Sequence, residues 1–264
     1  MVPTGETAPA FVSLAANPLR WRLLTALAAS DYRVRELVDL LGHPQNLISY
    51  HLRLLRRSGL VTAHRSSFDA RDSYYHLDLE RCAHALTAVG VALHPAIHLD
   101  PIPSPPTAAA HRARSARPRV LFACTGNSAR SPIAEALLRH RGGGHVEVTS
   151  AGSHPGPRLH PNAVRVLREH YGIDITDRRP CHLDTVARHR FDHLISLCDK
   201  VREVWPEFSG QPRLTHWSIR DPAAAGDNDQ ESYPAFRHMA AEIDTRIRYL
   251  LPVLGRATNP ETRP

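Results

Sequence analysis

The stretch VLFACTGNSARSPIAEALL, residues 120–138, decides the fold of the second half of this 264-residue chain. Residues 120–123 predict a short buried strand, and Cys124 stands where this strand ends. The pair Ser131-Pro132 opens a helix that is predicted to extend to Arg139, because proline suits the first turn of a helix. Five residues separate Cys124 from Arg130, so a tight loop joins the strand to the helix.

The Cys124 loop, residues 124–131, is predicted to bind a tetrahedral oxyanion. Its backbone amides and the positive end of the helix would converge on the anion, and the same field favours the thiolate form of Cys124. Arg130 would clamp the anion with two parallel hydrogen bonds, which a lysine would reproduce poorly. A buried cysteine beside an incidental turn is the alternative, but strand, loop and helix occur in the required order. The predicted oxyanion-binding residues are Thr125, Gly126, Asn127, Ser128, Ala129 and Ser131, and the Ser131 hydroxyl can also hydrogen-bond the thiolate.

Strands and helices continue to alternate after this loop, which predicts a parallel α/β sheet. Strands are predicted at residues 146–149, in FDHLISLC (191–198) and in LTHWSI (214–219), and helices at 161–170 and 233–254. An Asp-Pro pair, Asp221-Pro222, follows the last strand. An isolated pair of this kind would indicate only a turn.

The first half of the chain has a helical pattern. Asn17-Pro18 predicts the start of one helix, and a second carries Val34, Leu37, Val38 and Leu41 on one face before Gly42-His43-Pro44 breaks it. A third helix begins near Gln45, with Ile48, Leu52 and Leu55 on its buried side. The runs LVTAH (60–64) and DSYYHLDL (72–79) predict a hairpin, and a further helix begins near Leu79.

Two consecutive helices followed by a hairpin predict a winged helix-turn-helix that reads duplex DNA. The second helix of the pair would enter the major groove, and the hairpin arginines would hold phosphate. A small helical bundle with a solvated face is the alternative reading of the same pattern. The predicted DNA-binding residues are Gln45, Asn46, Ser49, Tyr50, His51 and Arg53 on the helix, and Arg65 and Arg71 on the hairpin.

A stretch rich in proline, alanine and arginine separates the two halves and predicts a linker. We therefore expect a DNA-binding domain at 1–95, a linker at 96–118, an α/β domain at 119–255 and a tail at 256–264. The chain has a formal net charge of +7, which favours a polyanionic partner or an anionic substrate. No signal peptide or membrane span is evident, so we predict a cytoplasmic protein. Four cysteines, Cys82, Cys124, Cys181 and Cys198, are too few for a disulfide framework and indicate free, metal-binding or redox-active thiols.

The sequence ELVDLLGHPQNLISYHLRLLRRSGLVTAHR (36–65), with SYYHLDL (73–79), resembles the ArsR/SmtB family of metal-responsive winged-helix repressors over residues 14–95. The resemblance implies a homodimer that binds operator DNA and is released by a metal or metalloid. Arsenite sensors of this family carry a cysteine pair near the start of the second helix. Arg33 and Arg35 stand there, so that inducer site is predicted to be absent. No metal site is predicted, and the remaining candidates for metal ligands are Cys82, His84, His94 and His98.

The Cys124 loop, together with TSAGSHPG (149–156) and FDHLISLCD (191–199), resembles the low-molecular-weight protein tyrosine phosphatases over residues 119–255. This resemblance implies a doubly wound α/β sheet, with Cys124 as nucleophile and Asp221 as general acid. Thioredoxin-linked arsenate reductases share this fold and place their second redox cysteine where Cys198 stands. They also share the CTGNS form of the loop, with Asn127.

Three alanines at 223–225 follow Asp221-Pro222, where phosphotyrosine phosphatases tend to place aromatic residues. We therefore favour arsenate reduction, in which Cys198 attacks a Cys124-arsenic adduct and leaves a disulfide. The third cysteine of the thioredoxin-linked enzymes is replaced by Trp205. The disulfide would then be reduced directly by thioredoxin, by a low-molecular-weight thiol system, or with Cys181 as the missing thiol.

The sequence thus predicts a transcriptional regulator fused to a thiol-dependent arsenate reductase, with a setting in arsenic resistance. It would bind operator DNA, an arsenate or phosphate-type oxyanion and an external thiol reductant, with no bound cofactor and no membrane association. Two alternatives stay open. One is a phosphatase that hydrolyses phosphate monoesters through a phosphocysteine, and the other is a repressor whose second domain only senses an oxyanion.

Overall fold

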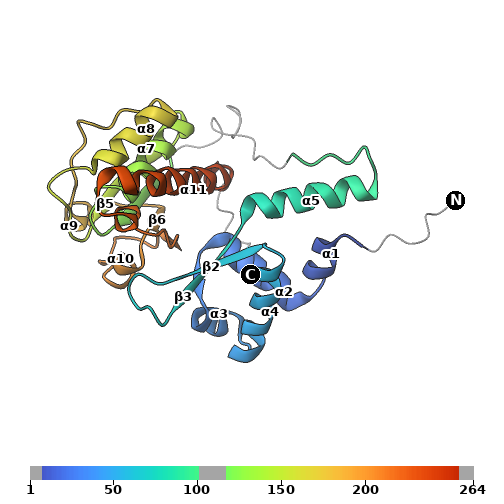
Figure 1. Ribbon diagram of the computed structural model, residues 1–264. Coiled ribbons are helices and arrows are strands. Elements are labelled where there is room, and N and C mark those ends of the chain that lie inside the picture. Colours follow the sequence, from blue (N-terminus) through green and yellow to red (C-terminus); the bar gives the residue numbers. More distant parts are fainter. Residues whose placement is uncertain (1–7, 101–116, 256–264) are drawn as a thin grey trace. The chain divides into compact units, whose positions relative to one another are not determined.

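The computed structural model describes residues 8–100 and 117–255, which belong to two compact units, residues 1–103 and 104–264 (Figure 1). The division between the units falls inside the predicted linker, most of which lies outside the described residues, as does the predicted tail. Each unit has its own hydrophobic core. The two units are described separately below.

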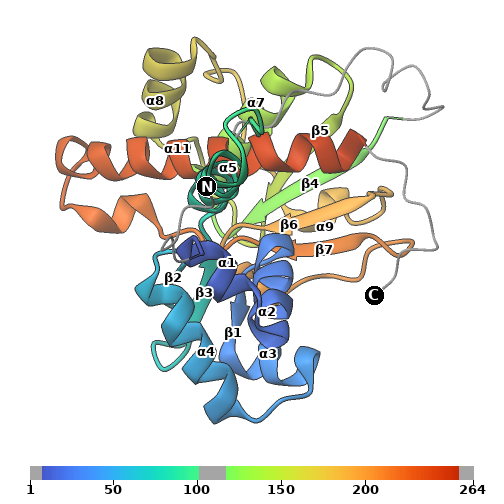
Figure 2. The same cartoon turned by 90° about the vertical axis from the view of Figure 1, so that its right-hand side faces the viewer.

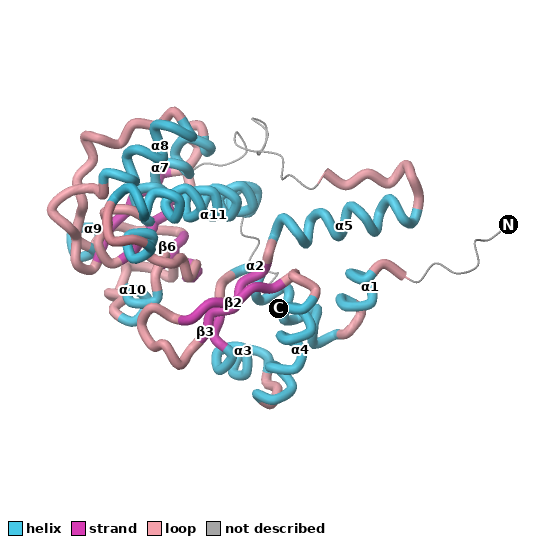
Figure 3. The backbone as a smooth tube through the Cα atoms, in the orientation of Figure 1, coloured by secondary structure: helices cyan, strands magenta, loops and turns pink. Residues whose placement is uncertain are grey.

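The amino-terminal unit is mainly helical and carries a small antiparallel sheet. Its helices are α1 (Ala10–Ala15), α2 (Pro18–Ala29), α3 (Val34–Leu41), α4 (Gln45–Arg57) and α5 (Leu79–Leu93). The strands β1 (Tyr32–Arg33), β2 (Val61–Arg65) and β3 (Ser73–Leu77) pair in the order β1-β3-β2. In Figure 3 the β2–β3 hairpin is drawn in magenta. The predicted helix-turn-helix and hairpin are confirmed, whereas α1 and β1 were not predicted.

Local sequence signals explain where these helices begin and what they bury. The Asn17 side chain accepts a hydrogen bond from the Arg20 backbone N–H (3.1 Å), and Pro18 occupies the first helical position of α2. Asp78 caps α5 in the same way. The side chains of Leu23, Leu37, Ile48, Leu52 and Leu55 are almost completely buried and form the centre of this core.

One residue of the predicted DNA-reading face lies on the wrong side of its helix. His51 is only 8% exposed and belongs to the buried face of α4, so the prediction that it contacts bases is corrected. Its Nδ1 atom has no hydrogen-bond partner within the described part of the chain. Burial lowers the pKa of His51 below its ordinary value, and the nearby charges of Arg20 and His43 lower it further.

The buried His51 predicts a loss of stability in acid. Because its pKa is lower in the folded than in the unfolded chain, the unfolded state takes up the proton first as the pH falls below about 6.5. The amino-terminal unit should therefore become less stable between neutral pH and the lowered pKa. Limited proteolysis of the full chain, followed at cleavage sites within residues 17–63, measures this effect. His51→Gln, which cannot titrate, should show a weaker pH dependence, and identical pH profiles for both proteins would contradict the assignment.

The carboxy-terminal unit is a doubly wound α/β domain. Its parallel sheet has the order β5-β4-β6-β7, formed by β4 (Arg119–Cys124), β5 (Glu147–Gly152), β6 (His193–Ser196) and β7 (Arg213–His216). The helices are α7 (Arg130–Gly142), α8 (Pro161–Tyr171), α9 (Leu183–Val186), α10 (Asp199–Glu203) and α11 (Asp229–Gly255), with a 3-10 turn, η1, at Pro222–Ala225. Figure 2 shows α7, α8 and α11 together on one side of the strands. The predicted parallel sheet is confirmed, and only the short elements α9, α10 and η1 were not predicted.

The direction in which strands are added to this sheet reverses at β4. The chain passes from β4 to β5 on one side and then returns to form β6 on the other side of β4. Ligands of open α/β sheets bind at such a switch point, beyond the carboxyl ends of the strands. Cys124 ends β4 and Cys198 follows β6, so both thiols lie at this switch point.

No helix in the part of the chain that the structure describes is both long enough and apolar enough to cross a membrane.

Candidate active site and nucleic-acid interface

The Cys124 loop lies between the end of β4 and the start of α7. Cys124 is buried, and its Sγ lies 2.9 Å from the Ser131 hydroxyl. The 13-residue helix α7 begins at Arg130, so its free N-terminal amides and its positive dipole end belong to the loop. This is the arrangement that an oxyanion site requires.

Asn127 holds the loop in an unusual conformation. Its φ of 43° is the only positive φ of a non-glycine residue among the described residues. The Asn127 amide group donates to the hydroxyls of Ser131 and Ser150 (2.9 Å each) and accepts from the Cys181 backbone N–H (2.8 Å). Because three contacts fix the side chain, the strained backbone is held in place.

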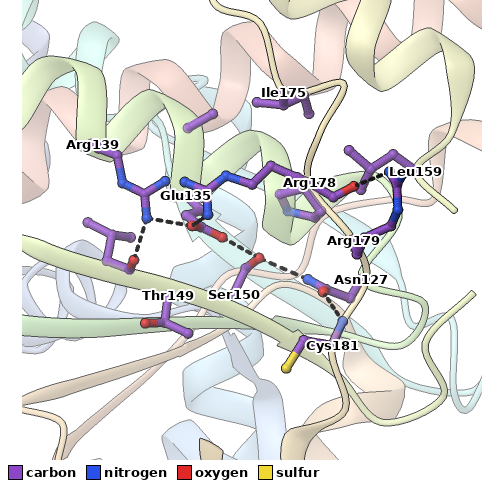
Figure 4. A pocket seen from close by; sticks show the side chains of 13 residues that line it. Asn127, Glu135, Arg139, Thr149, Ser150, Leu159, Ile175, Arg178, Arg179 and Cys181 are labelled. Atoms are coloured by element: carbon purple, nitrogen blue, oxygen red, sulfur yellow. Dashed lines mark hydrogen bonds and ion pairs between the residues drawn. The ribbon is translucent and has the colours of Figure 1, made fainter.

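A cavity of about 240 Å³ lies behind the loop and contains the continuation of this network (Figure 4). The Ser150 hydroxyl donates to Glu135 (2.6 Å), and Glu135 in turn pairs with Arg139 (2.6 Å) and Arg178 (3.4 Å). A chain of polar contacts therefore extends from these arginines through Asn127 to the hydroxyl beside the Cys124 sulfur. The network supports the loop through Asn127.

Arg130 and Asp221 come together at the mouth of the loop. The Arg130 guanidinium is buried, and it donates to the Asp221 carboxylate (2.9 Å) and to the Ile219 carbonyl (3.1 Å). Burial alone would lower the pKa of Arg130, but the negative groups around it, Cys124 foremost, raise it above its ordinary value. The Asp221 side chain is about half exposed and is open to solvent. A permanent cation and a carboxyl group thus face the same loop.

Cys198 is buried against the other side of the loop. The Leu197 backbone N–H donates to the Ala123 carbonyl (2.7 Å), which fixes the end of β6 beside the end of β4. The Cys198 sulfur lies 3.3 Å from the Thr125 hydroxyl. Burial raises the pKa of the Cys198 thiol, whereas Arg130 and the hydrogen bond with Thr125 act in the opposite direction. The structure therefore brings a second thiol to the loop.

Cys181 and Trp205 do not complete a relay with Cys198. Cys181 precedes His182, which bridges to Gly152 at the outer side of β5, whereas Cys198 follows β6 on the opposite side of β4. The Cys181 sulfur lies 2.7 Å from the Thr185 hydroxyl. Trp205 packs against the hydrophobic core and against Phe208. The geometry thus gives Trp205 a packing role, and it separates Cys181 from the second thiol.

Gly152 supports the loop and was not recognised from the sequence. It stands opposite Cys124 in the parallel register of β4 and β5. A Cβ atom at this position would lie 2.5 Å from the Thr125 carbonyl and 2.9 Å from the Asn127 backbone nitrogen. Both atoms belong to the backbone of the loop, so a side chain could be accommodated only by displacing it. A glycine at the end of the neighbouring strand was the available signal.

Gly152→Ala is therefore expected to weaken phosphate binding to the loop by about tenfold or more, because overpacking of this kind costs about 1–3 kcal/mol. Gly156→Ala is the matched control, since a Cβ there meets its nearest neighbours at 3.7 Å, an ordinary contact. Calorimetric titration with phosphate measures both variants. Equal affinities would show that close approach of β5 does not shape the loop.

The predicted DNA-reading residues other than His51 lie at the surface of the amino-terminal unit. On α4, Gln45, Asn46, Tyr50 and Arg53 are exposed and Ser49 is half-buried. Arg65, the last residue of β2, and Arg71, in the segment that joins β2 to β3, are both exposed. A helix with a polar outer face and a basic hairpin are thus both available to a nucleic acid.

Arg33 and Arg35, which stand where arsenite sensors carry their cysteine pair, both form ion pairs. Arg33 pairs with Glu36 (2.8 Å), and Arg35 pairs with Asp72, which directly precedes β3 (2.7 Å). Of the weak metal-ligand candidates, Cys82 is a poor ligand because burial, together with Asp78, raises its pKa to about 12. Cys82, His84, His94 and His98 form no group of three or more potential ligands within the described residues.

Comparison with known families matches both halves of the chain. Residues 119–259 match the family described as low molecular weight phosphotyrosine protein phosphatase, and residues 17–63 match the arsR family of bacterial regulatory proteins.

Individual relatives match the second half. The arsenate reductase of Halalkalibacterium halodurans is 34% identical over 129 residues, which are 49% of this chain and 91% of the relative. The glutaredoxin arsenate reductase of a Synechocystis species is 31% identical over 133 residues, 50% of this chain and 95% of the relative. A solved structure of an arsenate reductase in the phosphate-binding state covers 52% of this chain and 98% of its own, with 30% identity and a TM-score of 0.45.

Proposed function

Because the chain belongs to the low molecular weight phosphotyrosine protein phosphatase family through residues 119–259 and carries an arsR-family domain at residues 17–63, we propose that it is a transcriptional regulator fused to an arsenate reductase. The observation that carries the enzymatic half is the position of Cys198. Ester hydrolysis through a phosphocysteine requires Cys124, Arg130 and Asp221 but no second thiol. A buried thiol in contact with Thr125 of the same loop supports reduction.

In the first step the Cys124 thiolate attacks the arsenic atom of arsenate, held by the loop amides and by Arg130. A sulfur–arsenic bond forms and an arsenic–oxygen bond breaks. Protonated Asp221 donates a proton to the departing oxygen, which leaves as water. The position of Asp221, next to Arg130 at the mouth of the loop, supports this role.

In the second step the Cys198 sulfur attacks the Cys124 sulfur, and the proton of the Cys198 thiol passes to an oxygen of the departing arsenite. The sulfur–sulfur bond forms, the sulfur–arsenic bond breaks, and the electron pair of that bond goes to arsenic. Arsenic(V) thereby becomes arsenic(III) and leaves as arsenite, while two thiols become one disulfide. An external thiol, either thioredoxin or a low-molecular-weight thiol system, then reduces the disulfide. We place this reaction in the cytoplasm, where such thiols are kept reduced.

The surroundings of Asp221 suit a small anion better than an aryl ester. Ala223, Ala224 and Ala225 are exposed on η1 and directly follow the Asp221-Pro222 pair. Methyl groups offer no ring on which a phenyl group could stack. This feature supports arsenate as the substrate. Incubating the protein with arsenate and each thiol system in turn, and measuring arsenite, tests both the activity and the reductant.

The amino-terminal unit would bind operator DNA as a homodimer. Helices α1 and α5 contact each other and expose apolar side chains, among them Val12, Leu86 and Leu93. A second copy of the unit would cover these side chains, because exposed apolar groups that lie close together favour association. Sedimentation of the full chain measures the dimer, and a monomer at micromolar concentration would contradict it.

The double variant Ser49→Ala, Arg53→Ala should weaken operator binding by about tenfold or more, since each base contact contributes about 1–3 kcal/mol. Both side chains belong to the outer part of α4. Fluorescence anisotropy with a promoter fragment from the protein's own operon measures the affinity. The control variant Arg22→Ala, Thr25→Ala removes the same charge and a hydroxyl from exposed positions of α2. Equal weakening by both variants would show that α4 does not read the operator.

A further inference from the structure

Four buried polar side chains form a connected group beside the active site. The Ser196 hydroxyl lies 2.8 Å from His216 Nδ1, and His216 Nε2 lies 3.0 Å from Asp199 Oδ1. The Ser218 hydroxyl donates to the same carboxylate oxygen (2.6 Å). Each of the four residues is at most 4% exposed, so the group is screened from water.

This group joins the two segments that carry the reacting groups. Asp199 is the first residue of α10 and directly follows Cys198, while Ser196 ends β6 just before it. On the other segment, His216 ends β7 and Ser218 follows it. That segment continues to Ile219, whose carbonyl accepts from Arg130, and then to Asp221.

Because Asp199 is buried, its contacts with Ser218 and His216 determine where the start of α10 lies. A carboxylate that is removed from water needs hydrogen-bond donors around it, because burial of an unpaired charge is costly. Asp199 receives the Ser218 hydroxyl and faces the His216 ring, and its charge also acts on Arg130. The start of α10, and with it Cys198, is thereby fixed relative to the end of β7.

Serine, histidine and aspartate occur here in the order of a hydrolytic triad, but Ser196 lies within β6, whereas the free helix N-terminal amides that could hold an oxyanion belong to the Cys124 loop. The Ser196 hydroxyl faces the ring of His216 within the core. The group must therefore act through position.

We propose that His216 is a positioning residue for the second thiol: through Asp199 it fixes the start of α10 and so holds Cys198 where its sulfur can attack Cys124. The inference rests on the proposed arsenate reduction, and it concerns only the attack of the Cys198 sulfur on Cys124. The Cys124 loop has its own supports in Asn127, Ser131 and Gly152. Loss of the His216–Asp199 contact should therefore impair the attack by Cys198 more than the first step.

Two substitutions of His216 separate the contact with Asp199 from the presence of the ring. In His216→Gln the side-chain amide nitrogen can reach the place of Nε2 and keep a donor to Asp199. In His216→Asn the shorter side chain reaches only the place of Nδ1, near Ser196, and the donor to Asp199 is lost. His140→Asn, at an exposed position late in α7, is the control for a histidine-to-asparagine change.

The experiment measures three quantities in the full chain. We expect His216→Asn to slow arsenate-dependent disulfide formation by about tenfold or more, because small displacements of reacting groups are costly. Hydrolysis of p-nitrophenyl phosphate should stay within about threefold of the parent, and His216→Gln should restore most of the disulfide rate. In a Cys124→Ser background, His216→Asn should also speed the alkylation of Cys198 by iodoacetamide, because the thiol is no longer held in place.

Three results would overturn the inference: an equal loss of both activities, no loss of either, or an unchanged alkylation rate. The outcome is distinct from failure of the proposed function. If the parent forms no disulfide with arsenate, arsenate reduction is wrong, whereas the alkylation rate of Cys198 still decides whether His216 positions this thiol.

Discussion

Cys198→Ser is expected to abolish arsenate reduction and to leave phosphate-ester hydrolysis within about threefold of the parent. A serine oxygen can replace the sulfur in the contact with Thr125, so the loop should keep its shape. It cannot form a disulfide, so the Cys124-arsenic adduct would not be resolved by an internal thiol. Release of arsenite and hydrolysis of p-nitrophenyl phosphate, measured on the same preparation, check the two halves of this expectation.

Cys181→Ser is the matched control for this experiment. Cys181 lies on the side of β5 away from Cys198, and its backbone N–H rather than its sulfur supports Asn127. We expect this variant to reduce arsenate at nearly the parental rate. If Cys181→Ser were inactive and Cys198→Ser active, the identity of the second thiol would be wrong. If neither substitution affected arsenite release, the internal disulfide itself would be wrong.

Arg130→Lys should lower both activities by about 10²- to 10³-fold, the usual effect of losing a preorganised donor to a developing oxyanion. The guanidinium donates to Asp221 and to the Ile219 carbonyl at the same time, with two of its nitrogen atoms. A lysine ammonium keeps the charge but cannot reproduce this planar arrangement. Steady-state rates with arsenate and with p-nitrophenyl phosphate measure the loss.

Arg188→Lys, at an exposed position of the same unit, controls for the exchange itself and should change neither rate. Parental rates in Arg130→Lys would contradict the role of a bidentate clamp. A loss confined to one substrate would show that the two reactions use different anion sites.

The Cys124 loop could be predicted from sequence because its determinants are local. Strand, nucleophile, arginine and helix start all occur within residues 120–132, and neighbouring backbone atoms decide their geometry. The first turn of α2 was predictable for the same reason, since Asn17 and Pro18 act within one helical turn. Local signals of this kind need no knowledge of tertiary contacts.

For His51 the helical periodicity indicates the correct face of α4, whereas the polar residue type indicates the wrong one. Ile48, His51, Leu52 and Leu55 occur at i, i+3, i+4 and i+7, so the buried stripe of α4 includes the histidine. The prediction named His51 among the side chains of this helix that could reach base edges. Following the helical period alone would have placed it correctly.

Other features depend on contacts between distant segments and could not be predicted. Gly152 meets Thr125 and Asn127 only because of the register between β4 and β5. The contact between Asp199 and His216 likewise requires β6 and β7 to end at the same level. Neither arrangement has a signature within a short stretch of sequence.

The most direct test of the account is a single turnover of the reduced protein with excess arsenate and no external thiol. The account predicts about one arsenite released per chain, together with a disulfide that peptide mass spectrometry locates between Cys124 and Cys198. Release of arsenite without this disulfide, or tight binding of arsenate with neither product, would contradict it.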